Sequence, residues 1–203
     1  MSKGKKIFVA TATGILILVI VVSVFLILLR PKEIHELELD TVYRACGHVP
    51  TKYSGVYYVE LKSDGTYILM YDDAHGYEED YGYEAGVLPN IEYRKGTYEK
   101  KGTDYILHAT EGGVVGFIDL EAVQKKQIFT KRTMTEEQLK ENTQYNLDVV
   151  WKTEENEYKV GGLYEDGSYG GGYTLYTSNR KDIPDSLQEF FKEYKLVEEE
   201  TTI

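Results

Sequence analysis

The chain has 203 residues and a formal net charge of −11, with 23 Lys and Arg against 34 Asp and Glu. Residues 1–32 contain five basic and no acidic residues, so the remaining 171 carry 18 basic and 34 acidic residues, a formal charge of −16. Phosphate binding needs clustered Lys and Arg, so this acidic part argues against nucleic acid as a partner. The single cysteine, Cys46, excludes an intramolecular disulfide.

The first predicted element is a membrane-spanning helix over residues 7–29, after a short basic tip of residues 1–6. The run holds no charged residue and ends at Arg30-Pro31-Lys32. As a helix it would be about 34 Å long, enough to cross a hydrocarbon core of about 30 Å. A cleaved signal peptide is the alternative, but its apolar region spans about 7 to 15 residues and ends at a small-x-small cleavage site. The length therefore favours an uncleaved signal-anchor.

The orientation of this anchor follows from its flanking cations, because Lys and Arg tend to remain cytoplasmic. The tip carries three lysines and the α-amine, whereas the far flank carries Arg30 and Lys32. We therefore expect a single-pass cell-membrane protein with a cytoplasmic N-terminus and an extracytoplasmic C-terminal domain. An exported domain with no disulfide is typical of a bacterium with a single membrane.

Residues 30–52 are predicted to form a stalk and entry segment. Residues 36–40 alternate like a strand, while Ile34, Leu37 and Thr41 could form a helical stripe. The pattern leaves both conformations open, and the acidic residues of the segment are expected to keep it solvated.

Residues 53–197 are predicted to form a β domain with a C-terminal helix, followed by a tail of residues 198–203. Alternating, tyrosine-rich runs joined by Gly-containing turns predict three hairpins, over residues 56–71, 96–109 and 157–177. Further strand candidates span residues 114–120, 126–131 and 146–151. About eight or nine strands at this spacing predict a small antiparallel barrel or sandwich.

Two helices interrupt the β pattern. Thr135 and Gln138 have the spacing of a capping box, which predicts a short helix ending near residue 142. The second helix is expected to begin at residues 182–185, where Pro184 suits a first turn. Its apolar residues share one face and are predicted to pack across the open end or the side of the β domain: Ile183, Leu187, Phe190, Phe191 and Tyr194.

The tyrosine-rich hairpins resemble those of a known class of protein domain. They leave their turns through Gly65-Thr66-Tyr67 and Gly96-Thr97-Tyr98, and they lie between a predicted anchor and a terminal helix. They are similar to the lipocalin-like (calycin-type) β-barrel domains of exported bacterial proteins, over roughly residues 53–194. Gly55-Val56-Tyr57 stands where classical lipocalins have Gly-x-Trp, and the single tryptophan, Trp151, lies far downstream. The resemblance implies a binding or assembly role and carries over no site residues.

The densest acidic loop spans residues 72–80. A calcium ion takes several carboxylate oxygens, and this loop could offer those of Asp72, Asp73, Glu78, Glu79 and Asp80. The loop does not match the Asp-x-Asp-x-Asp-Gly pattern, so a solvated loop is the preferred interpretation and a calcium site the alternative. No other metal, cofactor or catalytic residue is predicted, and His108 is expected to face solvent.

The 19 tyrosines are expected to serve mostly in the core and in cross-strand pairs. An aromatic cluster that binds a sugar or a peptide is the strongest ligand hypothesis. The sequence thus favours a non-enzymatic, membrane-anchored extracytoplasmic module with a protein, peptide or glycan partner. The alternatives are an accessory subunit of a larger membrane complex and an enzyme whose site is assembled only in space.

Overall fold

The computed structural model describes residues 18–23, 32, 34–46, 55–74, 88–140 and 147–197. The chain divides into two compact units, residues 1–32 and 33–203. In the first unit, residues 18–23 are helical, and the apolar side chains of residues 18–22 are 47–63% exposed. The rest of the predicted span 7–29 lies outside the described residues. Among the residues that are described, no helix is both long and apolar enough to cross a membrane.

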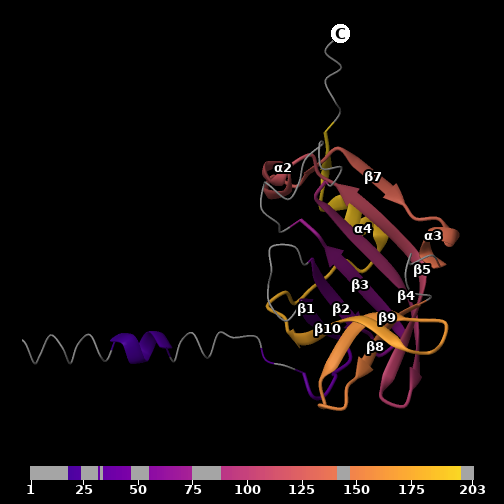
Figure 1. The fold of residues 1–203 in the computed structure, drawn as a ribbon. Coiled ribbons are helices and arrows are strands. Elements are labelled where there is room, and N and C mark those ends of the chain that lie inside the picture. The colour runs from indigo at the N-terminus through magenta and orange to yellow at the C-terminus, as the bar shows by residue number, and fades with distance from the viewer. Residues whose placement is uncertain are drawn as a thin grey trace, which may run out of the picture. The chain divides into compact units, whose positions relative to one another are not determined.

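The second unit is mainly β (Figure 1). Its strands are β1 Thr41–Cys46, β2 Val56–Leu61, β3 Thr66–Asp72, β4 Asn90–Lys101, β5 Asp104–Gly116, β6 Gln127–Ile128, β7 Thr130–Thr133, β8 Leu147–Lys152, β9 Tyr158–Leu163, β10 Tyr169–Thr177 and β11 Lys195–Leu196. Its helices are α2 Leu120–Gln124, α3 Glu136–Lys140 and α4 Leu187–Lys192.

Eight of these strands close into an antiparallel barrel in which almost every strand pairs with its neighbour in the chain. The order runs β1-β2-β3-β4-β5-β8-β9-β10, and β10 pairs back with β1. Strand β7 pairs with the C-terminal part of β5, residues 113–116, whereas β8 pairs with residues 105–107 of the same strand. The prediction of a small antiparallel barrel is therefore confirmed over the alternative of a sandwich.

The predicted stalk is wrong for the part that the structure describes. Residues 41–46 form β1, which pairs with both β2 and β10 and so closes the barrel. Ile34 is buried in the barrel interior, and Leu37 packs against the same cluster. Strand β1 belongs to the β domain because its alternate side chains, including Tyr43 and Ala45, supply apolar surface that the interior needs.

The three predicted hairpins are confirmed, and their turns use the chemistry that the sequence indicates. Gly65, Gly102 and Gly167 all adopt positive φ, between 65° and 86°, a conformation that glycine reaches without steric cost. Asp64 Oδ1 accepts hydrogen bonds from the amide and the hydroxyl of Thr66, at 2.9 and 2.6 Å. Asp166 makes the same pair of bonds with Ser168, so the repeated phrase marks equivalent hairpin exits.

The domain has two apolar cores, one inside the barrel and one outside it. The inner core contains Tyr67 and Leu69 of β3, whereas the outer core contains Ile68 and Met70 of the same strand. Successive side chains of a strand point to opposite faces, so β3 is buried on both. Such burial on both faces accounts for the continuous apolar run of β3.

Helix α4 covers the outer face of β4 and β5, which confirms that the C-terminal helix packs on the side of the barrel (Figure 1). Phe190 stacks on Tyr93 with ring centroids 5.2 Å apart. A Cβ at Gly113 would lie 2.5 Å from Leu187 Cδ1, so glycine at this position of β5 lets the helix approach closely.

The expected start of the C-terminal helix, at residues 182–185, is wrong. The N-cap is Ser186, whose hydroxyl accepts a hydrogen bond from the Glu189 amide, while Glu189 accepts one from the Asp185 amide. These two hydrogen bonds at the N-terminus of α4 set the start of the helix after Pro184. At α3 the predicted box is present: Thr135 and Gln138 exchange side-chain to backbone bonds of 3.0 and 3.2 Å.

Other strand boundaries differ from the predictions. The candidate over residues 114–120 forms the end of β5 and then gives way to α2, which is capped by Asp119. The candidate over residues 126–131 divides into β6 and β7. The first difference arises where the Asp119 side chain accepts a hydrogen bond from the Ala122 amide, a competition that apolar periodicity does not report.

Candidate functional site

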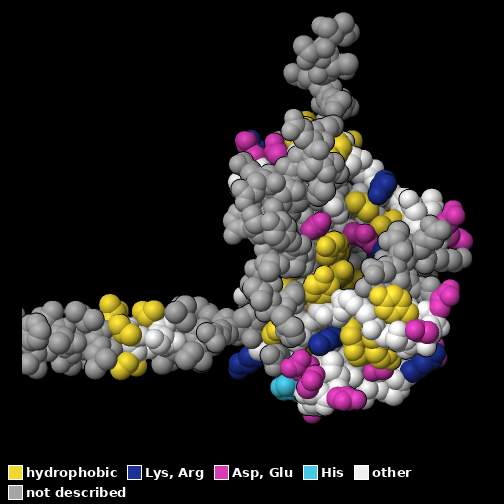
Figure 2. Space-filling view, in the orientation of Figure 1, with side chains coloured by type: hydrophobic (Ala, Val, Ile, Leu, Met, Phe, Trp, Pro, Cys, Tyr) yellow, Lys and Arg dark blue, Asp and Glu magenta, His cyan; other side chains and the backbone are white. Residues whose placement is uncertain are grey.

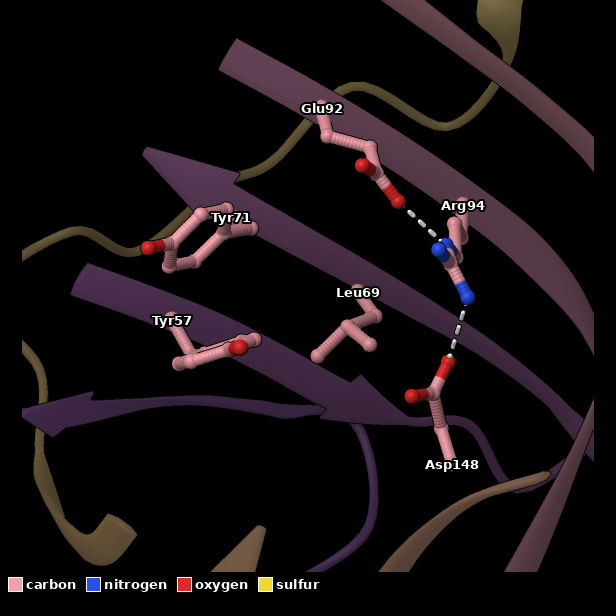
Figure 3. Close-up of a pocket in the computed structure, with 6 residues that line it drawn as sticks. All are labelled: Tyr57, Leu69, Tyr71, Glu92, Arg94 and Asp148. Carbon is pink, nitrogen blue, oxygen red and sulfur yellow. Dashed lines mark hydrogen bonds and ion pairs between the residues drawn. The ribbon is translucent and has the colours of Figure 1, made fainter. Parts of the chain in front are cut away.

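A cavity of about 170 Å³ opens among four strands of the barrel. Its lining residues come from β2, β3, β4 and β8 and are Tyr57, Leu69, Tyr71, Glu92, Arg94 and Asp148 (Figure 3). We call this cavity the barrel pocket. It combines aromatic and apolar walls with three charged groups, a composition that is typical of small-ligand sites.

Arg94 links the two carboxylates of the barrel pocket. Its Nε donates to Glu92 Oε1, and its Nη1 donates to Asp148 Oδ2 at 3.0 Å (Figure 3). The side chains of Arg94 and Asp148 are each 11% exposed, and that of Glu92 is 23% exposed. The two carboxylates raise the pKa of Arg94 against the opposing effect of burial, so the guanidinium remains charged.

The polar face of β4 lines the barrel because its apolar face is already occupied. Ile91 and Tyr93 belong to the outer core under α4, so Glu92 and Arg94, one residue out of phase, point inward. A β-bulge follows, in which Thr110 is the extra residue of β5 opposite Lys95 and Gly96 of β4. A Cβ at Gly96 would lie 1.9 Å from the His108 carbonyl oxygen, so this bulge requires glycine.

Tyrosine rings form one side of the barrel pocket. The Tyr57 ring lies 4.6 Å from that of Tyr71 and 5.1 Å from that of Tyr173, centroid to centroid, in tilted arrangements. A Cβ at Gly55 would lie 2.3 Å from Tyr71 Cε2, so the glycine leaves room for this ring. Burial, followed by the neighbouring groups Tyr71, Tyr173, Asp148 and Glu92, raises the pKa of Tyr57, which stays protonated.

A buried hydroxyl lies near the charged groups. Tyr67 is 0% exposed, and its hydroxyl has no hydrogen-bond partner within the part of the chain that the structure describes. Burial raises the pKa of Tyr67, Asp148 raises it further, and Arg94 lowers it, which places the hydroxyl within electrostatic reach of both groups. An unpaired hydroxyl is costly inside a protein unless a ligand or water satisfies it.

The acidic loop is only partly described. Asp72 and Asp73 lie at the end of β3, whereas Glu78, Glu79 and Asp80 lie outside the described residues. Asp72 is buried, and its Oδ1 accepts a hydrogen bond from the Ala74 amide at 3.1 Å. Burial and the charge of Asp72 raise the pKa of Asp73. The described residues form no group of three potential metal ligands, and the calcium site stays a prediction.

The remaining candidates have structural roles. His108 is exposed on β5, as expected. A Cβ at Gly161 would lie 2.6 Å from the Gly170 carbonyl oxygen, so the glycines of β9 and β10 permit close approach of two backbones at a register shift. Trp151 stacks on Tyr169 at 5.1 Å.

Sequence reasoning did not find Glu92, Arg94 or Asp148. One signal could have found the first two: a C-terminal helix with an apolar face needs an apolar outer surface to cover. If Ile91 and Tyr93 provide that surface, the alternation of β4 sends Glu92 and Arg94 into the barrel. Asp148 carries no comparable local signal, since only closure of the barrel brings β8 opposite β4.

Comparison with known proteins identifies no relative: no family model matches the chain, and no curated protein or solved structure matches it significantly. The closed, eight-stranded antiparallel barrel is compatible with a lipocalin-like fold.

Proposed function

We propose that this chain is a non-enzymatic binding module that takes a small ligand into the barrel pocket. One observation carries the proposal: three charged side chains are held inside a closed barrel, beside open space and a tyrosine wall. Replacing a buried ion pair by packed apolar residues is often neutral or stabilising, so folding alone does not require Arg94 and its partners there. Convergent polar groups in a concave, largely preformed site favour recognition.

A ligand screen by amide chemical shifts tests this function. We expect some member of a set of small polar compounds to shift the amides of Leu69, Glu92 and Asp148 in the full-length chain in neutral detergent. The amides of the exposed strand β7 serve as the internal control and should not move. A set of cations, anions, sugars and short peptides that leaves all three pocket amides unmoved would refute the binding function.

A lipocalin-like assignment of the barrel belongs to the same proposal. The support is the nearest-neighbour order of the eight strands, together with a pocket inside the barrel. Gly55 lies just before β2 and accommodates the Tyr71 ring at the barrel pocket.

We also propose that residues 7–29 hold the module at a membrane with the C-terminal domain outside the cytoplasm. Support comes from the uncharged apolar run in the sequence and from the exposed apolar side chains of the described helical residues 18–22. Exposed apolar surface of this kind is stable in lipid and costly in water.

Fractionation of cells tests the anchor. The full-length chain is expected to stay with membranes through a high-pH wash, whereas a chain lacking residues 1–29 should appear in the aqueous fraction. Protease added to intact cells should remove the C-terminal domain. Unprocessed full-length protein in the aqueous wash would refute the anchor, and a domain that survives the protease would refute the orientation.

A further inference from the structure

The charges that line the barrel pocket do not balance. Glu92 and Asp148 contribute two negative charges, and Arg94 is the one cation among the six lining residues. Both carboxylates pair with the same guanidinium. The six described lining residues thus carry a formal net charge of −1 inside the barrel, where charges are screened less than in water. An anionic ligand would have to displace a carboxylate from Arg94, whereas a cation would complete the charge balance.

The aromatic wall favours the same sign of charge. Tyr57 and Tyr71 line the barrel pocket at a ring separation of 4.6 Å, and the Tyr173 ring lies 5.1 Å from that of Tyr57. The face of an aromatic ring carries partial negative charge and attracts cations within about 6 Å of its centroid. Asp148 and Glu92 each raise the pKa of Tyr57, which reports a negative potential on this side of the pocket.

Tyr67 lies on the inward face of β3, two residues before the pocket residue Leu69, and is not itself one of the residues that line the pocket. It is fully buried and lies within electrostatic reach of Asp148 and Arg94. A hydroxyl oxygen can accept a hydrogen bond from a protonated amine or from a ligand hydroxyl.

The size of the barrel pocket limits the ligand. Its volume of about 170 Å³ is close to that of an engineered protein cavity of about 150 Å³ that holds benzene. A ligand of roughly six to ten non-hydrogen atoms fits this space.

We propose that the barrel pocket binds a small organic cation, an alkylammonium compound whose charge Glu92 and Asp148 balance and whose alkyl groups contact Tyr57 and Tyr71. This inference rests on the proposed binding function and adds the chemical class of the ligand. Arg94 holds the two carboxylates in place through its hydrogen bonds to both of them.

A matched set of three compounds tests the class of ligand. Choline, its uncharged isostere 3,3-dimethylbutan-1-ol and the anion 3,3-dimethylbutanoate share a branched head and differ in charge. Each is titrated into the full-length chain in uncharged maltoside micelles, and the amide shifts of Leu69 and Glu92 are followed. Choline is expected to bind at least tenfold more tightly than the isostere, and the anion should cause no shift.

Two variants of the same strand supply the charge control. Glu92→Gln keeps the shape of the side chain and should weaken choline binding at least fivefold while leaving isostere binding unchanged. Glu99→Gln removes the same charge from an exposed position of β4, where Glu99 pairs with Lys101, and should leave choline binding unchanged.

The outcomes separate the two proposals. Equal or tighter binding of the isostere or the anion at the pocket amides would overturn the cation inference and leave the binding function standing. If millimolar choline leaves the chemical shifts of the pocket amides unchanged, the cation inference is also overturned. The binding function itself fails only if the wider compound set leaves those amides unmoved too.

Discussion

Replacing Arg94 with methionine is expected to lower the free energy of unfolding by about 3 kcal/mol. The change leaves Glu92 and Asp148 inside the barrel with no guanidinium between them. Loss of one partner of a buried ion pair lowers the free energy of unfolding by about 3 to 5 kcal/mol. The lower value applies here because the Glu92 side chain is 23% exposed. Urea unfolding followed through the fluorescence of Trp151, the single tryptophan, measures the loss.

Two controls isolate the cause of this loss. Arg132→Met removes a cation from the exposed strand β7 and should change stability by less than about 0.5 kcal/mol. Adding Glu92→Gln and Asp148→Asn to Arg94→Met should recover most of the stability, because the buried charges are then gone. A deficit that persists in the triple variant would show that lost packing is the cause.

Replacing Phe190 with alanine is expected to lower the free energy of unfolding by about 3 to 5 kcal/mol. Phe190 is 0% exposed and contacts the rings of Tyr93, Phe191 and Tyr194 at centroid distances of 5.2 to 5.5 Å. Its removal leaves a cavity between α4 and the outer face of the barrel, and packed surroundings collapse into such a cavity only partly.

Phe191→Ala is the matched control, because the same side chain is removed from a half-buried position one residue further along α4. We expect roughly half the loss at this position, since less apolar surface is taken from the core. Equal losses in the two variants, measured by urea unfolding, would contradict the placement of Phe190 at the centre of the outer core.

The outer core also packs against β4, the strand that supplies Glu92 and Arg94 to the barrel pocket. Tyr93 stacks on Phe190 on one side of β4, while Glu92 and Arg94 face the opposite side. Helix α4 therefore packs against the strand whose inward-facing residues line the pocket.

Acidic side chains are scattered over the face of the domain seen in Figure 2, with hydrophobic side chains grouped towards its middle.

Local patterns in the sequence predicted the local parts of the fold. Asp64-Gly65 and Asp166-Gly167 form their turns with side-chain to backbone bonds that span two residues, and Thr135 with Gln138 forms a capping box that spans three. Interactions of such short range depend on neighbouring residues alone. The three hairpins and helix α3 were accessible from the sequence for this reason.

Tertiary structure alone decided which face of each strand lies inside the barrel. Period-two alternation shows that Glu92 and Arg94 share a face, but it does not show whether that face meets water or the interior. Here α4 covers the apolar face of β4, and closure of the barrel brings Asp148 from β8 to Arg94 across 54 residues of sequence. Strand β1 became part of the barrel for a similar reason, because its pairing partners β2 and β10 are defined only when the sheet closes.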